Sequence, residues 1–137
     1  MIKLYSYYTM IYKAQHKAGI HGRLGEETAK KYLVNNGYTI LHTNFHSKFG
    51  EIDIIAEKDS MLVFIEVKTR SDHFKFGLPE EAINYLKMRK IKRTIYEFFI
   101  KNPEYKFKNW KINLITVVLN SFEQPKKIVH YKNVEIL

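Results

Sequence analysis

Two short apolar runs near the middle of the chain form the clearest pattern in this sequence. Residues 52–56 and 62–67 are nearly continuous in aliphatic and aromatic side chains, and only the polar residues 57–60 separate them. Runs of this length and composition are typical of strands buried on both faces. The short polar interruption has the size of a hairpin turn. The sequence therefore predicts two antiparallel strands joined by a turn centred on Asp59 and Ser60.

The hydrophobic pattern on either side predicts the remaining elements. An apolar stripe at helical spacing predicts a helix over residues 24–36, and Gly37 ends it. A longer helix follows the central hairpin. Further strands are predicted over residues 38–45, 110–120 and 127–137. The resulting order, α-β-β-β-α-β-β, indicates an α/β fold with a mixed sheet flanked by helices.

The second predicted helix carries a concentration of positive charge. It begins at Pro79, with Glu80 and Glu81 in its first turn, and ends at Asn102. Its core stripe is expected to consist of Ala82, Ile83, Leu86, Ile91, Ile95, Phe98 and Phe99. Its middle contains five basic residues without an acid between them, namely Lys87, Arg89, Lys90, Lys92 and Arg93. Such a run is either the solvated face of the helix or a ridge that binds phosphates.

Charged residues interrupt the two central strands, where an unpaired charge is costly to bury. Side chains alternate along a strand, so Glu66 and Lys68 share one face, about 6–7 Å apart. With a tight turn, Asp53 lies opposite Glu66, with Cβ atoms about 4.5–5.5 Å apart. Two carboxylates this close repel each other, and a divalent cation is their natural partner. The alternative is a buried salt-bridge network of the same three residues without a metal.

Glu26 is the acidic residue of the first predicted helix that edges its inward stripe. Glu27 points away by about 100°, because of the helical period. Glu26 either faces the acids of the hairpin or complements the helix dipole in the first turn. Both interpretations stay open at this point.

The composition favours a polyanionic partner. The chain has 23 basic and 14 acidic residues, a formal charge of +9. This charge suits nucleic acid, and the alternative is a charge that serves solubility alone. Arg70 shares the face of Glu66 and Lys68 if the strand continues that far. There it would either clamp a phosphate through both guanidinium edges or face solvent.

Other function classes are excluded or disfavoured. The chain has no cysteine, so disulfides, thiolate metal sites and cysteine nucleophiles are excluded. No apolar run approaches the ~18 residues of a membrane span, and no signal-peptide core is evident. We therefore expect a cytoplasmic protein without a membrane partner. Residues 1–21 are expected to form a basic, Tyr-rich arm, either flexible or stacking on bases, and residues 22–137 a single domain.

The charged residues of the hairpin carry a family resemblance. Asp53, followed after twelve residues by Glu66, Val67 and Lys68, resembles the PD-(D/E)xK signature of the restriction-endonuclease-like nucleases. A wider set of segments resembles the YraN family, which is similar to Holliday-junction resolvases. The matching segments, between residues 22 and 118, are GRLGE (22–26), Ala29, YL (32–33), NF (44–45), GEID (50–53), VFIEVKTR (63–70), FG (76–77) and Lys87.

The resemblance implies a restriction-endonuclease-like domain over residues 22–137 and a role for each matching residue. Mg²⁺ or Mn²⁺ would be held by Asp53, Glu66 and the carbonyl oxygen of Val67. Lys68 would orient or deprotonate the attacking water, and Glu26 would join the site. Nucleic-acid contacts are expected from Arg23, Arg70, Lys87, Arg89, Lys90 and Arg93. Asn113 stands where the family often has Asp, so a charge that would tune the site is absent.

The expected function is therefore a metal-dependent nuclease that hydrolyses DNA, with branched or junction DNA as the candidate substrate. A homodimer is expected by analogy with junction resolvases. One alternative is a nucleic-acid-binding protein that keeps the nuclease fold without cleavage. Another is a protein-interaction domain whose charge is incidental.

Overall fold

The structure, a computed structural model, describes residues 2–71 and 84–136, with side chains described for residues 19–71 and 84–135. The helices are α1 (Ile2–Asn35), α2 (Tyr85–Lys101) and two short 3₁₀ helices, η2 (Pro103–Tyr105) and η3 (Val134–Ile136). The strands are β1 (Thr39–Ser47), β2 (Gly50–Lys58), β3 (Met61–Ser71), β4 (Trp110–Leu119) and β5 (Pro125–Tyr131).

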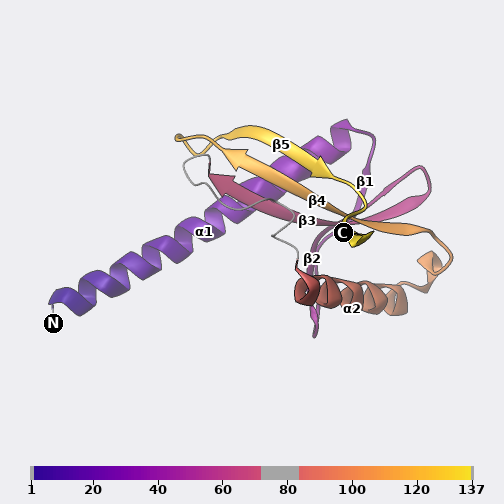
Figure 1. Ribbon diagram of the computed structural model, residues 1–137, viewed down its shortest axis with the longest axis horizontal. Helices are drawn as coiled ribbons and strands as arrows, with labels where there is room; N and C mark the ends of the chain where they lie inside the picture. Colours follow the sequence, from indigo (N-terminus) through magenta and orange to yellow (C-terminus); the bar gives the residue numbers. More distant parts are fainter. Residues whose placement is uncertain (1, 72–83, 137) are drawn as a thin grey trace.

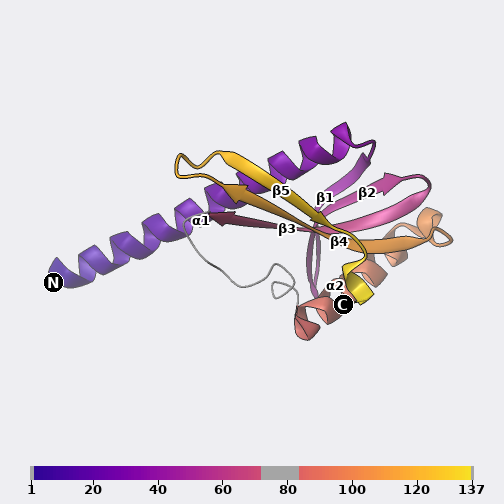
Figure 2. The ribbon, with the colours of Figure 1, turned by 45° about the horizontal axis from the view of Figure 1, so that its top comes forward.

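The strands form one five-stranded sheet in the order β1-β2-β3-β4-β5. The β3–β4 pair is parallel and the other pairs are antiparallel. Helix α1 packs on one face of the sheet and α2 on the other (Figures 1 and 2). The predicted α/β class, element order and mixed sheet of the restriction-endonuclease-like fold are confirmed.

The central hairpin forms as predicted. Lys58 pairs with Met61, and the register continues to Ile54 opposite Ile65. The turn residues Asp59 and Ser60 have φ angles of 51° and 63°. Two consecutive positive φ angles are the signature of a type I′ turn, whose twist matches that of antiparallel strands. A turn of this length holds the register without freedom to slip.

Each face of the sheet has its own apolar core, which explains why the central strands are apolar on both faces. On the α1 side, Ala29 and Leu33 pack against the strands, and on the α2 side Ile91, Ile95 and Phe98 do so. Side chains from β3 alternate between the two cores. The α1 side takes Val63, Ile65 and Val67, whereas the α2 side takes Leu62 and Phe64. Glu66 and Lys68 therefore belong to the α2 side by alternation.

The first helix is longer than the sequence predicts. A start at Leu24 was expected, but α1 begins at Ile2, and the end at Gly37, with φ 85°, agrees with the prediction. Figure 1 shows the N-terminal half of α1 extending past the edge of the sheet. A helical segment with no sheet beneath it needs no apolar stripe. The helical period that marks residues 24–36 is therefore lacking in the part of α1 that precedes them. The division into an arm and a domain stays a prediction, and its boundary falls inside α1.

The second helix also differs at its start. Asn84 has extended backbone angles, and its side chain accepts a hydrogen bond from the amide of Lys87, which makes it the N-cap of α2. The predicted start at Pro79, the acidic first turn of Glu80 and Glu81 and the core positions Ala82 and Ile83 lie outside the described residues, as do Phe76 and Gly77 of the family resemblance. The assignment of Leu86 to the core is wrong, because 66% of Leu86 is exposed.

The C-terminal strand is shorter than predicted. An extension from Lys127 to Leu137 was expected, but β5 ends at Tyr131 and η3 follows. Asn133 takes a φ angle of 56°, which no strand accommodates. Within residues 2–71 and 84–136, no helix combines the length and apolar character that crossing a bilayer requires.

Candidate active site

The candidate site lies where β2 parts from β3. The ladder between these strands ends at Ile54 and Ile65. Asp53 and Glu66 are the next residues of β2 and β3 beyond this pair. Oδ2 of Asp53 accepts a hydrogen bond of 2.7 Å from the amide of Val67. A side-chain carboxylate thus replaces the backbone carbonyl that a continuing β2 would have offered.

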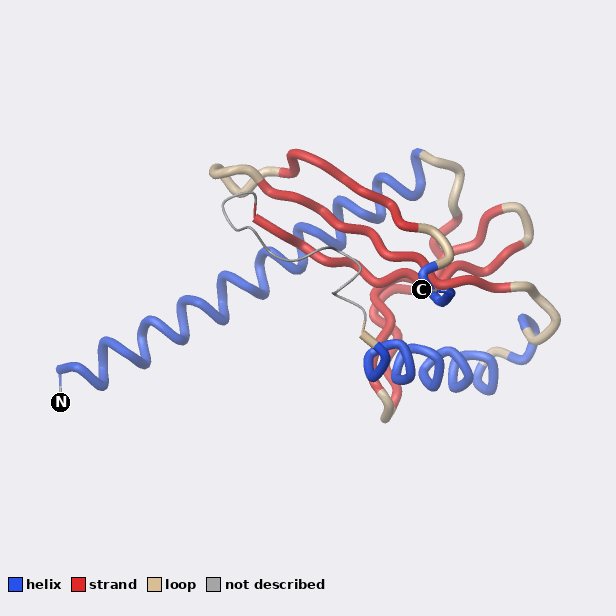
Figure 3. The backbone as a smooth tube through the Cα atoms, in the orientation of Figure 1, coloured by secondary structure: helices blue, strands red, loops and turns tan. Residues whose placement is uncertain are grey.

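A local irregularity in the β1–β2 hairpin explains this divergence. Ile52 packs on the α2 side of the sheet and Ile54 on the α1 side, although alternate residues of a regular strand share a face. Asn44, which would face Asp53 across the hairpin, has a φ angle of 52°. Asn tolerates this conformation better than most residues. The hairpin consequently bends beside α2 (Figure 3), and the bend places the carboxylate of Asp53 at the end of β3.

Burial makes the charge of Asp53 unfavourable. Asp53 is 8% exposed and Glu66 9%. Burial, and then the neighbouring charge of Glu66, raise the pKa of Asp53 to about 7, while the hydrogen bond from Val67 acts in the opposite direction. The more distant carboxylates Glu26 and Glu51 raise this pKa further. A positive group at this position would therefore be bound favourably.

Two lysines hold the carboxylate of Glu66. Oε1 of Glu66 lies 2.6 Å from Nζ of Lys87 and 3.3 Å from Nζ of Lys68. Burial lowers the pKa of Lys68, and the neighbouring Lys87 lowers it further. Burial also acts to lower the pKa of Lys87, but the hydrogen bonds with Glu66 and Lys68 outweigh it, and the net shift is upward. Lys68 is therefore the lysine of this pair that gives up its proton more readily.

Glu26 reaches the neighbourhood of the site because α1 packs closely on β3. A side chain at Gly25 would collide with the hydroxyl and β-carbon of Thr69, so only glycine permits this approach. Glu26 is half-buried next to Gly25, and its charge contributes to the raised pKa of Asp53. Glu27 is exposed and pairs with Lys30, as its predicted outward direction requires.

The acid pair fits a divalent cation with few protein ligands. Among the described residues, no three His, Cys, Asp or Glu side chains come together as a metal cage. Asp53 and Glu66 each use one carboxylate oxygen in a contact with the protein, which leaves Oδ1 of Asp53 and Oε2 of Glu66 without a partner in the described chain. Mg²⁺ is usually bound through one or two carboxylates and keeps several waters. The carbonyl of Val67 points to the same strand edge as its amide, toward Asp53.

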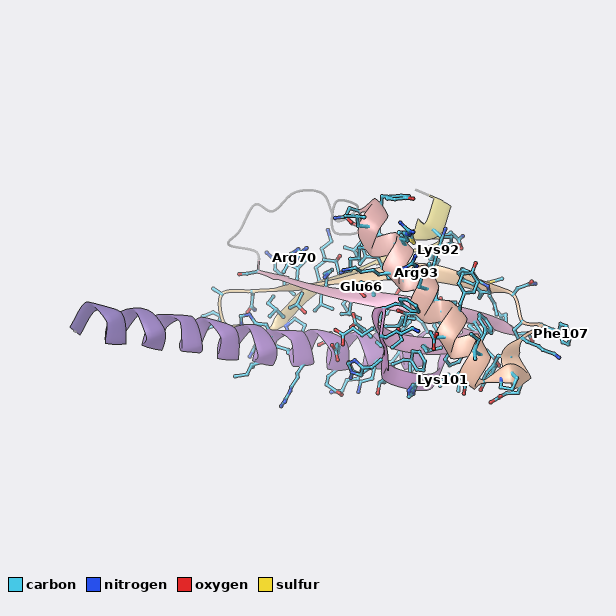
Figure 4. The ribbon with its side chains drawn as sticks, turned by 90° about the horizontal axis from the view of Figure 1, so that it is seen from below. Glu66, Arg70, Lys92, Arg93, Lys101 and Phe107 are labelled. Carbon is cyan, nitrogen blue, oxygen red and sulfur yellow. The ribbon has the colours of Figure 1, made fainter. Side chains whose placement is uncertain are left out.

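The predicted nucleic-acid contacts do not form a single ridge. Lys87 lies at the acid pair, and Arg70 lies further along β3, which continues to Ser71 (Figure 4).

The other predicted contacts lie on different sides of the helices. Lys90 lies beside Gly50 on the β1–β2 side of α2, whereas Arg89 lines a groove on the β4–β5 side. Arg93 lies 5.3 Å from the ring of Phe49 and also lines the groove, and Arg23 is exposed on α1.

Asn113 does not belong to the candidate site, which corrects the sequence interpretation. It pairs with Ile65, so it faces α1, on the opposite side of the sheet from Glu66. Its amide nitrogen lies 2.7 Å from Nε2 of His130, and its oxygen accepts a hydrogen bond from the amide of Asn133. An Asn at this position therefore affects the packing of the C-terminal segment and leaves the charge around Asp53 unchanged.

Comparisons with known proteins show the family of this chain. The model of the uncharacterised protein family UPF0102 matches residues 25–117. This range includes both acids of the pair, Asp53 and Glu66, and both lysines, Lys68 and Lys87. The chain belongs to the UPF0102 family. A UPF0102 protein of Clostridium botulinum is 42% identical over 112 residues, which cover 82% of this chain and 90% of the relative. A UPF0102 protein of Persephonella marina is 41% identical over 83% of this chain and 91% of its own length.

A third UPF0102 protein, from Caldicellulosiruptor bescii, is 52% identical over 79 residues, covering 58% of this chain and 65% of the relative. These matches confirm the family that the sequence motifs indicated. They name no activity, substrate or cofactor. The geometry of the site is therefore what indicates the roles of its residues in this UPF0102 protein.

Proposed function

We propose that this UPF0102 protein is a metal-dependent endonuclease that hydrolyses phosphodiester bonds of DNA, with branched or junction DNA as its substrate. The observation that supports this most is the pairing of two buried carboxylates, Asp53 and Glu66, next to a lysine whose pKa is lowered. A buried acid pair is unfavourable unless a cation compensates it. Perturbed groups gathered in this way are typical of catalytic sites.

Asp53 and Glu66 would hold Mg²⁺ or Mn²⁺, together with the carbonyl of Val67. When bound, such an ion lowers the pKa of a coordinated water and neutralises charge on a phosphate. Lys68, whose Nζ lies 3.3 Å from Oε1 of Glu66, would orient that water and, in its neutral form, would accept a proton from it, because burial lowers the pKa of Lys68. Lys87 keeps its proton and is the cation that meets the phosphate.

Cleavage of labelled junction and duplex DNA with Mg²⁺ or Mn²⁺ tests this proposal. Wild type is expected to cut, and Asp53→Ala and Lys68→Ala to lose at least ~100-fold in rate, as removal of a general base or metal ligand does. Glu27→Gln is the matched control, because it removes an exposed carboxylate of α1 beside Glu26. Cutting that persists unchanged in both site variants would contradict the nuclease proposal.

The second candidate is a nucleic-acid-binding protein without cleavage. The observation that favours it is the contact of Lys87 with Glu66, because an ammonium there already compensates one acid. Binding without cutting, in Mg²⁺ and in Mn²⁺, would support this alternative. In both cases affinity should fall as salt rises, since released counterions drive phosphate binding. An affinity independent of salt would instead favour a protein partner.

A further inference from the structure

A groove lies beside the acid pair, between the first half of α2 and the strands β4 and β5. It encloses about 580 Å³. Leu114 of β4 and Tyr131 of β5 form its floor, and Val134 with Glu135 of η3 closes one side. Figure 4 shows Lys92 on the side of α2 that faces this C-terminal segment. The proposed catalytic residues do not line it.

The charges of the groove suit an anionic ligand. Of the described residues that line it, Arg89, Lys92 and Arg93 are basic and Glu135 is acidic. The carboxylate of Glu135 accepts a hydrogen bond of 3.0 Å from the amide of Ile112, so part of its charge is already compensated. The remaining excess of positive charge is complementary to phosphate groups.

The aromatic side chains of the groove suit flat rings. Tyr85 and Tyr96 of α2 are 78% and 60% exposed, and Tyr131 lies on the floor between the walls. Nucleic-acid bases stack on such rings with little dependence on sequence. In a duplex the faces of the bases are covered by their neighbours. Tyrosines that stack on bases therefore select unpaired nucleotides.

The sheet register connects the groove with the acid pair. Glu66 pairs with Leu114 across the parallel β3–β4 ladder, and Leu114 pairs with Tyr131 across β4–β5. Neighbouring strands lie about 4.8 Å apart. The groove floor thus begins one strand away from Glu66 and reaches Tyr131 roughly 10 Å away. A strand of nucleotides bound in the groove would therefore pass within about one strand spacing of Glu66.

The geometry points to this groove as a binding site for the unpaired nucleotides of a strand that continues into the acid pair. The preferred ligand is nucleic acid with a single-stranded segment next to a duplex. Its continuation to a cleavable phosphate rests on the nuclease function proposed above. The binding of unpaired nucleotides does not depend on that function.

Fluorescence anisotropy without divalent cations tests the binding. A labelled oligothymidylate and a blunt hairpin duplex of equal charge are compared for wild type, Tyr85→Ala/Tyr96→Ala and Arg89→Gln/Lys92→Gln. The tyrosine variant should lose roughly tenfold or more in affinity for the single strand, because each stacked base contributes that much. Its affinity for the duplex should change less than about twofold. The Arg89 and Lys92 variant should weaken single-strand binding and lower its salt dependence.

Phe107→Ala and Lys101→Gln are the matched controls, because they remove an exposed ring and a cation outside the groove (Figure 4). Neither should alter single-strand binding by more than about twofold. The inference would be overturned if the tyrosine variant bound the single strand as tightly as wild type does. It would also be overturned if that variant lost equal affinity for the single strand and for the duplex. Equal competition by polyglutamate would also overturn it, because the groove would then accept any acidic chain.

Cleavage assays in Mn²⁺ separate this inference from the nuclease proposal. If wild type cuts a flapped duplex faster than a blunt one and the tyrosine variant loses that preference, both are supported. If nothing is cut but the tyrosine variant still loses single-strand affinity, the groove assignment stands and the nuclease proposal fails. If the tyrosine variant binds single strands like wild type, the groove assignment fails whatever is cut.

Discussion

Nζ of Lys87 lies 2.6 Å from Oε1 of Glu66, so an ammonium from α2 occupies one side of the acid pair. This contact joins the helix to the strand on which the candidate metal ligands lie. A cation bound between Asp53 and Glu66 would share Glu66 with Lys87 and be repelled by it. Removal of the lysine charge should therefore strengthen cation binding while it weakens the hold on a phosphate.

Lys87→Gln is expected to bind Mn²⁺ about fivefold more tightly than wild type, because a partly exposed charge pair contributes ~1 kcal/mol. Isothermal titration calorimetry without DNA measures this. Lys90→Gln, one turn along the same helix and beside Gly50, is the control with the same charge change. An unchanged or weaker Mn²⁺ affinity of Lys87→Gln would show that the lysine and the cation do not compete.

Asp53→Asn should stabilise the metal-free protein above neutral pH. The pKa of Asp53 is about 7 in the folded protein and ordinarily 3.8. The folded state therefore binds the proton of Asp53 more tightly than the unfolded state does. The contribution of Asp53 to stability is greatest below pH 4 and is lost as pH rises through 7. Asp53→Asn has no such loss. Its free energy of unfolding should exceed that of wild type by up to about 4 kcal/mol at pH 8 and by little at pH 4.

Urea unfolding of wild type and Asp53→Asn at pH 4, 6 and 8, with a chelator present, measures this gain. Asp59→Asn provides the control, because it makes the same change in the turn of the same hairpin. A gain that is the same at all three pH values would show that the charge of Asp53 is not the cause.

Protonation of His130 should destabilise the fold in acid. Its ring nitrogens lie 3.2 Å from the hydroxyl of Tyr32 and 2.7 Å from the amide of Asn113. Burial, and then the positive charges of Lys132, Lys111 and Lys58, lower its pKa to about 4 from 6.5. The unfolded chain takes up the proton first, so stability should fall between pH 6.5 and 4.

This loss opposes the effect of Asp53, so it is best measured in the Asp53→Asn background. There His130→Gln should lose less stability than its parent between pH 6.5 and 4. His46→Gln is the control, because it makes the same substitution at an exposed histidine. Identical acid sensitivity in all of these variants would contradict the role assigned to His130.

Gly25→Ala should destabilise the protein by roughly 1–3 kcal/mol, the usual cost of overpacking. The added methyl group would meet the side chain of Thr69. Gly22→Ala, on the same helix, has open space around it and should be neutral or stabilising by up to ~1 kcal/mol. Thermal unfolding compares the two.

The double variant Gly25→Ala/Thr69→Ala removes the hydroxyl that the added methyl group would meet and should recover some of the lost stability. Equal effects of alanine at Gly22 and Gly25 would show that α1 does not approach β3 as closely as the structure indicates.

The sequence indicated the acid pair because the two acids lie at the same distance from a short polar turn. That turn determines the register of β2 and β3 as far as Ile54 opposite Ile65, and Asp53 and Glu66 are the next residues of the two strands. The ion pair of Glu66 with Lys87 was not predicted from the sequence, because it depends on how α2 returns over the sheet. The family resemblance marked Lys87 as a residue of interest, and only the structure shows that its partner is Glu66.

The groove and the length of α1 were out of reach for different reasons. Tyr85, Tyr96 and Tyr131 come together only after α2 has packed over β4 and β5, and no sequence period records that. The N-terminal half of α1 extends beyond the sheet and lacks the stripe that reveals a helix (Figure 1). The face on which Asn113 lies could not be predicted either, because the register of a parallel pair depends on a crossover that the sequence does not specify.

The central claim is that Asp53 and Glu66 together bind a divalent cation. Anomalous diffraction from a crystal soaked in Mn²⁺ tests it most directly. We predict one anomalous peak within coordination distance of both carboxylates, absent in Asp53→Asn. A map without a peak at this position, with Lys87 still on Glu66, would contradict the claim.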